Sequence, residues 1–161
     1  MTHALATVEH AITVRQPYAQ CIAIGRKPVE NRGKPTQHRG PIAIHAGQAE
    51  HEHGKTDPRV IALYGADPTV GMARGAVIAV ANLVDCHPAE DRGPGRTCCE
   101  PWGAAVYVTK AKAVPAFHLV FADVALLASP VPARGSLWFP WVMPADVQTA
   151  VRARLAEAVT R

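Results

Sequence analysis

The chain has 161 residues, of which 48% are hydrophobic and 19% are charged. This length and composition are typical of one globular domain with its own core, and the chain is too short for us to expect two. The balance of 17 Lys and Arg against 13 Asp and Glu gives a formal net charge of +4. A mild basic excess is compatible with a polyanionic partner, although many enzymes share it.

The two longest apolar runs, residues 76–84 and 118–128, are too short or too interrupted to span a bilayer. The first ten residues lack the basic start and apolar stretch of a secretion signal. We therefore expect a cytoplasmic protein with no membrane partner. In a reducing compartment its four cysteines are expected to be mostly thiols.

The predicted elements, in chain order, follow a loose arm at residues 1–10. Alternating and β-branched residues predict strands, while Gly, Pro and capping residues predict where helices begin and end. The expected strands are 11–15, 41–47, 76–87, 102–111 and 117–128, and the expected helices are 18–25, one that begins at Asp57-Pro58, and 144–159. The segment 87–101 is rich in Pro, Gly and charge and is expected to be a loop.

Strands outnumber helices in this pattern, and regular helices do not alternate with strands after residue 65. We therefore expect an α+β fold with a small, curved, mixed β-barrel and flanking helices, rather than a doubly wound parallel sheet. The last helix places four apolar residues on one face, namely Val147, Val151, Leu155 and Val159. This face predicts that the helix packs on the same domain.

A charged segment, GRKPVENR, follows the first predicted helix and runs from Gly25 to Arg32. Pro28 disfavours helical geometry at Lys27, so the segment is expected to be extended or to turn. On an extended chain Glu30 and Arg32 point to the same side, and Lys27 can swing towards it. A partly buried lysine beside a carboxylate is a candidate acid–base group. Judged by spacing alone, an exposed ion-pair loop is the more common structure for such a segment.

The same segment resembles a family signature. The pattern G-x-K-x-x-E-x-R, here Gly25, Lys27, Glu30 and Arg32, is similar to that of the ASCH domain (activating signal cointegrator homology), a PUA-like β-barrel family. Other stretches resemble further family segments in the same order: ITVRQPYAQCIAIG (12–25), RGPIAIHAG (39–47), EPWG (100–103) and PVPARGSLWFPWVMP (130–144). The resemblance implies an ASCH domain over residues 11–145, with 146–161 as a C-terminal helix of the same domain.

The resemblance implies a protein that binds RNA or a modified nucleotide in a basic cleft beside the barrel. Basic side chains would meet phosphates, aromatic rings would stack on a base, and the helix start at Gln16-Pro17 would favour an anion. The expected ligand-binding residues are Arg15, Gln16, Tyr18, Lys27, Glu30, Arg32, Arg39, His45 and Trp102. No cofactor is expected.

A hydrolytic branch of the family, which removes acyl groups from modified cytidine, implies an alternative. That branch has a lysine at the position of Lys27 and a hydroxyl residue where this chain has Glu30. Here Glu30 would activate a water while Lys27 stabilises the oxyanion. A ribonuclease with His45 as acid or base is another alternative, and so is His45 closing a strand by hydrogen bonds. Whether the protein is an enzyme, and whether it has a protein partner, stays open.

Cysteine and histidine residues bracket the predicted loop, namely Cys86, His87, Cys98 and Cys99. Two thiolates and two imidazoles can bind zinc. However, neither the CH pair nor the CC pair has the C-x-x-C spacing that lets two ligands converge. We therefore expect thiols that line a loop and no metal site. His51 and His53 lie on an acidic stretch and are expected to be solvated.

Overall fold

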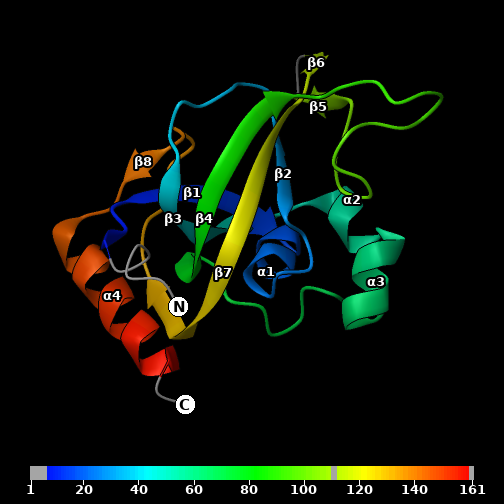
Figure 1. Ribbon diagram of the computed structural model, residues 1–161. Helices are drawn as coiled ribbons and strands as arrows, with labels where there is room; N and C mark the ends of the chain where they lie inside the picture. Colours follow the sequence, from blue (N-terminus) through cyan, green and yellow to red (C-terminus); the bar gives the residue numbers. More distant parts are fainter. Residues whose placement is uncertain (1–6, 110–111, 160–161) are drawn as a thin grey trace.

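The computed structural model describes residues 7–109 and 112–159 (Figure 1). The strands are β1 (His10–Gln16), β2 (Val29–Arg32), β3 (Gly40–Glu50), β4 (Ala76–Pro88), β5 (Val106–Val108), β6 (Ala113–Pro115), β7 (Phe117–Pro132) and β8 (Trp141–Val142). The helices are α1 (Tyr18–Ala23), α2 (Glu52–Lys55), α3 (Pro58–Tyr64) and α4 (Ala145–Val159). Within the described ranges, no helix is long and apolar enough to cross a membrane.

Six strands form one mixed sheet in the order β2-β7-β4-β3-β1-β8, and β5 pairs with β6 in a separate hairpin. β1 is parallel to β3, and the other neighbouring pairs are antiparallel. The expected α+β class is therefore confirmed. The expectation of a closed barrel has to be corrected. Among the described strands, β2 and β8 are the two edges of an open sheet. β2 has four residues and β8 has two, too few for a ladder that closes the sheet.

A side chain nevertheless joins two distant strands of this sheet. The guanidinium of Arg32, on edge strand β2, donates from Nη2 to the backbone oxygen of Thr13 on β1. In the sheet order, β1 lies near the opposite edge. The sheet must therefore curl strongly enough for an arginine to reach across its open side.

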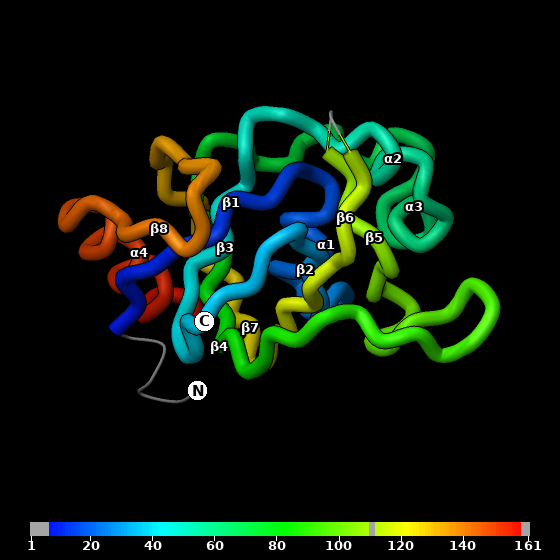
Figure 2. The backbone as a smooth tube through the Cα atoms, turned by 90° about the horizontal axis from the view of Figure 1, so that it is seen from above, coloured from blue at the N-terminus to red at the C-terminus, as the bar shows by residue number. Residues whose placement is uncertain are grey.

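Alternate residues of the strands face opposite sides of the curled sheet. Ile12 of β1 and Ile44 of β3 pack with Ile22 of α1 in one apolar cluster. Their neighbours Ala11 and Ala43 belong to a second cluster, which α4 covers. Figure 2 shows α4 and α1 on opposite sides of the central strands. Each face of the sheet thus has its own helix.

The helix ends follow the expected local chemistry. Gly25 has φ +73° after α1, a left-handed conformation that favours glycine. Asp57 caps α3 by accepting a hydrogen bond from the backbone N–H of Arg59 at 2.9 Å. In α4 the described members of the predicted apolar face, Val147, Val151 and Leu155, are buried against the sheet.

A small third cluster joins elements that are far apart in sequence. It contains Cys21 of α1, Val29 of β2, Val60 of α3 and Trp102 of the loop 89–105. Because these residues are buried together, the start of α3 and the loop are held next to β2. This arrangement positions the charged segment.

Several expected segments differ in extent: β3 and β7 are longer than the strands expected at 41–47 and 117–128. Of the strand predicted at 102–111, residues 102–109 form a strand only at β5, and residues 110–111 lie outside the described residues. Trp102 lies in a turn before β5 and is 8% exposed. Of the expected arm, residues 1–6 lie outside the described residues. Val8 is fully buried, and the backbone oxygen of Glu9 accepts a hydrogen bond from Met143. Residues 8 and 9 are therefore packed on the domain and are not part of a loose arm.

Candidate functional site

Three of the four charged side chains of GRKPVENR meet in the structure, and the fourth, Arg26, is exposed. Nζ of Lys27 lies 3.1 Å from Oε2 of Glu30, and Nε of Arg32 lies 3.4 Å from Oε1 of the same carboxylate. The side chains of Lys27, Glu30 and Arg32 are 3%, 13% and 19% exposed. Val29 points the other way into the third cluster, as strand alternation predicts. Lys27, Glu30 and Arg32 therefore form a largely buried ion-pair network and not an exposed one.

Lys27 is surrounded by acceptors and aromatic rings. Its ammonium donates to the backbone oxygen of Val29 and to Glu30. The same ammonium lies 5.2 Å from the ring centroid of Tyr18 and 5.8 Å from that of Trp102. An ammonium has three N–H groups, and these two bonds use two of them. The third is left for the rings or for a ligand.

Tyr18 is held by the start of α3. Its hydroxyl donates to Oδ2 of Asp57 at 3.0 Å. Burial, and then the Asp57 carboxylate, raise the pKa of Tyr18 well above its usual value, so the hydroxyl stays protonated. Asp57 also binds the side chain of Arg59 at 2.8 Å. The Arg59 guanidinium in turn lies 4.1 Å from the ring centroid of Trp102. One carboxylate therefore anchors both the tyrosine and the cation that packs on the tryptophan.

His51 and Arg15 lie on the same side of the molecule as Tyr18. The His51 ring centroid is 5.0 Å from that of Tyr18, and the His51 backbone N–H donates to the oxygen of Gln16. Burial lowers the pKa of His51, the Glu30 carboxylate opposes this shift in part, and the charge of Arg15 lowers the pKa further. His51 is thus a neutral, half-buried ring and not the solvated side chain that the sequence led us to expect. Arg15 is exposed and pairs with no carboxylate in the described part of the chain.

Two of the expected ligand residues are buried and internally bonded. Gln16 is fully buried, its amide donates to Ala73, and its oxygen accepts from the backbone of Gln20. His45 is 1% exposed and Nε2 bonds to the oxygen of Ala133 at 3.0 Å. The Gln16 side chain therefore stabilises the start of α1, and His45 ties β3 to the segment after β7.

Arg39 lies with a different group of residues. It bonds to the backbone oxygen of Cys86 at 3.2 Å and approaches Asp85 at 3.5 Å, both near the end of β4. Two surface clefts of about 420 and 710 Å³ lie elsewhere, and neither is lined by Lys27, Glu30 or Arg32. The candidate site is thus tightly packed, with only 3% of the Lys27 side chain exposed.

The comparison with known families assigns the chain to a domain family. A model of the ASCH domain matches residues 12–123, which is well over half of the chain and includes GRKPVENR. The chain belongs to the ASCH domain family. This family is part of the PUA-like superfamily. No curated protein matches the chain.

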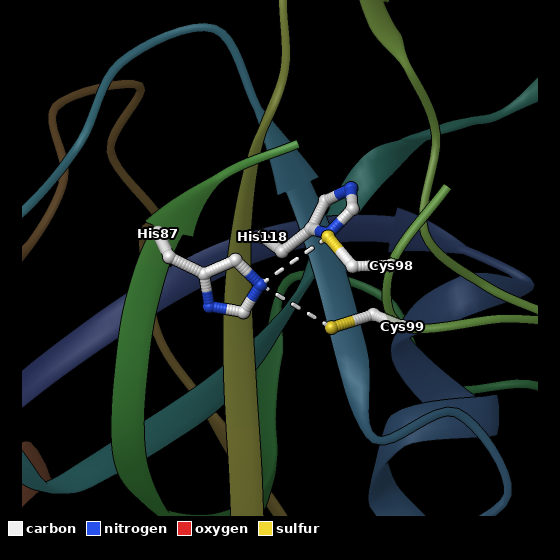
Figure 3. A group of neighbouring side chains, drawn as sticks. All are labelled: His87, Cys98, Cys99 and His118. Carbon is white, nitrogen blue, oxygen red and sulfur yellow. Dashed lines mark hydrogen bonds between the residues drawn. The ribbon is translucent and has the colours of Figure 1, made fainter. Parts of the chain in front are cut away.

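The ASCH domain also brings together most of the cysteine and histidine residues considered above. The ligand atoms of His87, Cys98, Cys99 and His118 all lie within 4.8 Å of one another (Figure 3). Cys86 is not in this group, because it packs beside the apolar cluster under α1. His118 was missed by the sequence analysis, since its place depends on the pairing of β4 with β7.

Proposed function

We propose that this ASCH domain binds RNA by holding one nucleotide, modified or unmodified, at the network of Lys27, Glu30 and Arg32. The observation that carries this proposal is a buried lysine–carboxylate pair beside two aromatic rings. A nucleotide combines a flat base, a polar base edge and a phosphate. The network supplies a partner for each of these three parts.

The base would lie against Tyr18 and Trp102, since aromatic rings stack on any base. Trp102 is 8% exposed, so its ring has to shift as the base enters. The remaining N–H of Lys27 would donate to a carbonyl on the base edge. Glu30 would accept from an amino group, because a carboxylate has about four lone-pair sites and the two cations use only part of them. These donors and acceptors give the site its selectivity.

The phosphate would be met by few cations. Arg15 is exposed, and its charge acts on His51, whose ring packs near that of Tyr18. Arg32 is partly exposed. Farther from the network, several arginines are paired with carboxylates: Arg39 with Asp85, Arg92 with Glu90, and Arg96 with Glu100. This pairing reduces the positive charge available for a long RNA track. We therefore expect a shallow salt dependence, with a slope of about −1 to −2 in a plot of log K against log salt.

Hydrolysis of an acylated nucleoside is a second candidate, favoured by the 3.1 Å contact between Lys27 and Glu30. In that reaction Glu30 would take a proton from water, and the water oxygen would attack the amide carbon. Lys27 would stabilise the oxyanion, and the leaving amine would take the proton as the C–N bond breaks. Both oxygens of Glu30 already face cations. An attacking water would have to share these oxygens with the two cations, which weakens Glu30 as a base. Binding is therefore our preferred function.

The test is a fluorescence titration with cytidine, N4-acetylcytidine and a short single-stranded RNA, followed by a search for product. Lys27→Met and Glu30→Gln should each weaken binding by about tenfold, because a hydrogen bond to a charged group is lost. Lys55→Met is the matched control, since Lys55 pairs with Glu50 and Glu52 and has no contact with the network. Circular dichroism checks that each variant is folded.

Binding of any of these ligands that weakens in both network variants, without product, supports the binding function. Release of acetate from N4-acetylcytidine that is lost in both variants favours the hydrolase. Absence of binding by the wild-type protein, or equal binding by all the variants, contradicts both.

A further inference from the structure

We propose that His87, Cys98, Cys99 and His118 bind a zinc ion, which clips the loop 89–105 onto strands β4 and β7. Figure 3 shows the four side chains pointing toward one another from the two strands and the loop. This group is separate from the proposed nucleotide site and does not depend on it.

The strand pairing brings the two histidines together. His87 near the end of β4 is the direct cross-strand partner of His118 near the start of β7. Their ring centroids lie 5.5 Å apart. The two cysteines reach the same place from the loop, eleven and twelve residues after His87. Four ligands from three segments therefore converge without any local metal-binding motif.

The distances agree with a tetrahedral zinc site. With Zn–S near 2.3 Å and Zn–N near 2.1 Å, a sulfur and a nitrogen ligand lie about 3.6 Å apart. Sγ of Cys98 is 3.2 Å from Nδ1 of His118 and 3.6 Å from Nε2 of His87. Sγ of Cys99 is 3.4 Å from Nε2 of His87. The other pairs are at most 4.8 Å apart, so a cation has only to draw them slightly inward.

The outer nitrogens of both histidines have acceptors. Nδ1 of His87 lies 2.7 Å from a carboxylate oxygen of Asp85. Nε2 of His118 lies 2.9 Å from the backbone oxygen of Ala104. Each outer nitrogen therefore carries the proton, and each inner nitrogen presents its lone pair to the group. Histidines that ligate zinc are oriented by such carboxylate and carbonyl partners.

The backbone around the cysteines also fits a metal site. Sγ of Cys98 accepts a hydrogen bond from the N–H of Glu90 at 3.2 Å, a contact that stabilises a thiolate. Cys99 has φ +63°, a left-handed conformation that is rare for a residue with a side chain. Gly103 is required nearby, since a Cβ there would lie 2.2 Å from the oxygen of Cys98.

The ligand set identifies the metal and its role. Two thiolates with two imidazoles at tetrahedral spacing suit zinc, whereas calcium and magnesium require oxygen ligands. Four protein ligands leave no open position, so the ion is structural and not catalytic. His118 is fully buried and the other three side chains are partly buried.

The proposed zinc site would also fix the position of Trp102. The backbone N–H of Trp102 donates to the oxygen of Cys99 at 3.1 Å, and its oxygen accepts from Asn31 at 2.9 Å. The side-chain oxygen of Asn31 accepts a hydrogen bond from the backbone N–H of Ala104. The backbone oxygen of Ala104 in turn bonds to Nε2 of His118. The zinc ligands and the turn that carries Trp102 thus belong to one hydrogen-bonded unit.

The test measures metal content in the full chain, purified without a histidine tag from cells grown with zinc. The wild-type protein should contain one zinc per chain, and Cys98→Ser and Cys99→Ser should each lose most of it. Cys86→Ser is the matched control, because it removes a neighbouring thiol outside the group. In case the serine variants do not fold, cobalt(II) is added to reduced, chelator-stripped wild-type protein. A tetrahedral visible spectrum with a sulfur-to-cobalt band, displaced by one equivalent of zinc, is expected.

Three results would overturn the proposal. The first is wild-type protein that holds no zinc as purified and gives no tetrahedral cobalt spectrum. The second is a Cys86→Ser variant that loses zinc as completely as Cys98→Ser. The third is a disulfide between Cys98 and Cys99, found by mass spectrometry in metal-free protein purified from the same cells without added reductant.

Discussion

Nζ of Lys27 and the carboxylate of Glu30 lie 3.1 Å apart, with the lysine almost completely buried. Two residues separate them in the chain, and the turn after Gly25 directs both side chains to one place. A buried charge is tolerated when its partner is in contact, and it is costly when the partner is removed. The pair therefore links the stability of this ASCH domain to the chemistry proposed for it.

Lys27→Met should lower the free energy of unfolding by about 3 kcal/mol, because it leaves the Glu30 carboxylate without its closest cation. Lys27→Met/Glu30→Gln should recover part of this loss. Urea denaturation of the single and double variants measures the coupling between the two side chains. Strictly additive effects would show that the two groups do not interact in solution.

Asp57→Asn should keep the cap of α3 but lose the charged contacts to Arg59 and Tyr18, at a cost of about 1 kcal/mol near pH 7. Burial opposes ionisation of Asp57, yet the hydrogen bonds from Arg59 and Tyr18 outweigh it and lower the pKa of this carboxyl. A lowered pKa contributes stability that is present above the unfolded value, about 4, and is lost as the pH falls below it. Wild-type and Asp57→Asn stabilities should therefore converge below pH 4. A difference that stays constant down to pH 3 would argue against a charged contact.

His45→Gln should weaken the pH dependence of stability between pH 5 and 7. Burial lowers the pKa of His45, so between the folded and unfolded pKa values the unfolded chain binds a proton that the folded chain does not. Stability therefore falls as the pH drops below about 6.5, by up to about 1.4 kcal/mol per pH unit for one group. Chemical denaturation at several pH values measures the slope. His53→Gln, at an exposed position, is the control and should leave it unchanged.

Gly103→Ala should lower both stability and zinc content. The added Cβ would lie 2.2 Å from the oxygen of Cys98 and 2.7 Å from Cε1 of His118. Relieving such a clash typically costs about 1–3 kcal/mol and moves the backbone. Thermal melting and metal analysis measure the two effects. Ala105→Ser, at an exposed position two residues later, is the control, and an equal loss in both variants would contradict the account.

The parts of the fold that rest on local chemistry could be predicted from the sequence. The weak alternation of β1, the buried apolar run of β3, the Asp57-Pro58 helix start and the apolar face of α4 each need only a few neighbouring residues. Whether the sheet closes could not be predicted in this way. Closure depends on the length of the edge strands and on how far the sheet curls, which no single segment encodes.

The candidate site was likewise predictable only where it depends on neighbouring residues. Spacing alone placed Glu30 and Arg32 on one side of an extended segment, and Lys27 within reach. The contribution of Arg59 to the tryptophan environment was missed, because α3 and the loop meet only through the buried third cluster. Trp102 itself was expected in a strand, and its place in a buried turn follows from bonds to Asn31 and Cys99.

The group of His87, Cys98, Cys99 and His118 shows why spacing alone was an insufficient guide to which of these side chains meet. Adjacent strand residues point to opposite faces, so Cys86 and His87 could not both belong to one site. That alternation was the available signal. The fourth member of the group, His118, is 31 residues after His87, and its place opposite His87 depends on register shifts between β4 and β7. Sequence periodicity does not reveal such shifts.

The most direct test of the central claim is a map of amide and indole chemical shifts during titration with N4-acetylcytidine and with a short single-stranded RNA. The account predicts changes at residues 27–32, at Tyr18 and at the indole N–H of Trp102, all following one binding curve for each ligand. Changes confined to the clefts beside Pro130 or Pro94, or to α4, would contradict it and place the ligand elsewhere on the ASCH domain.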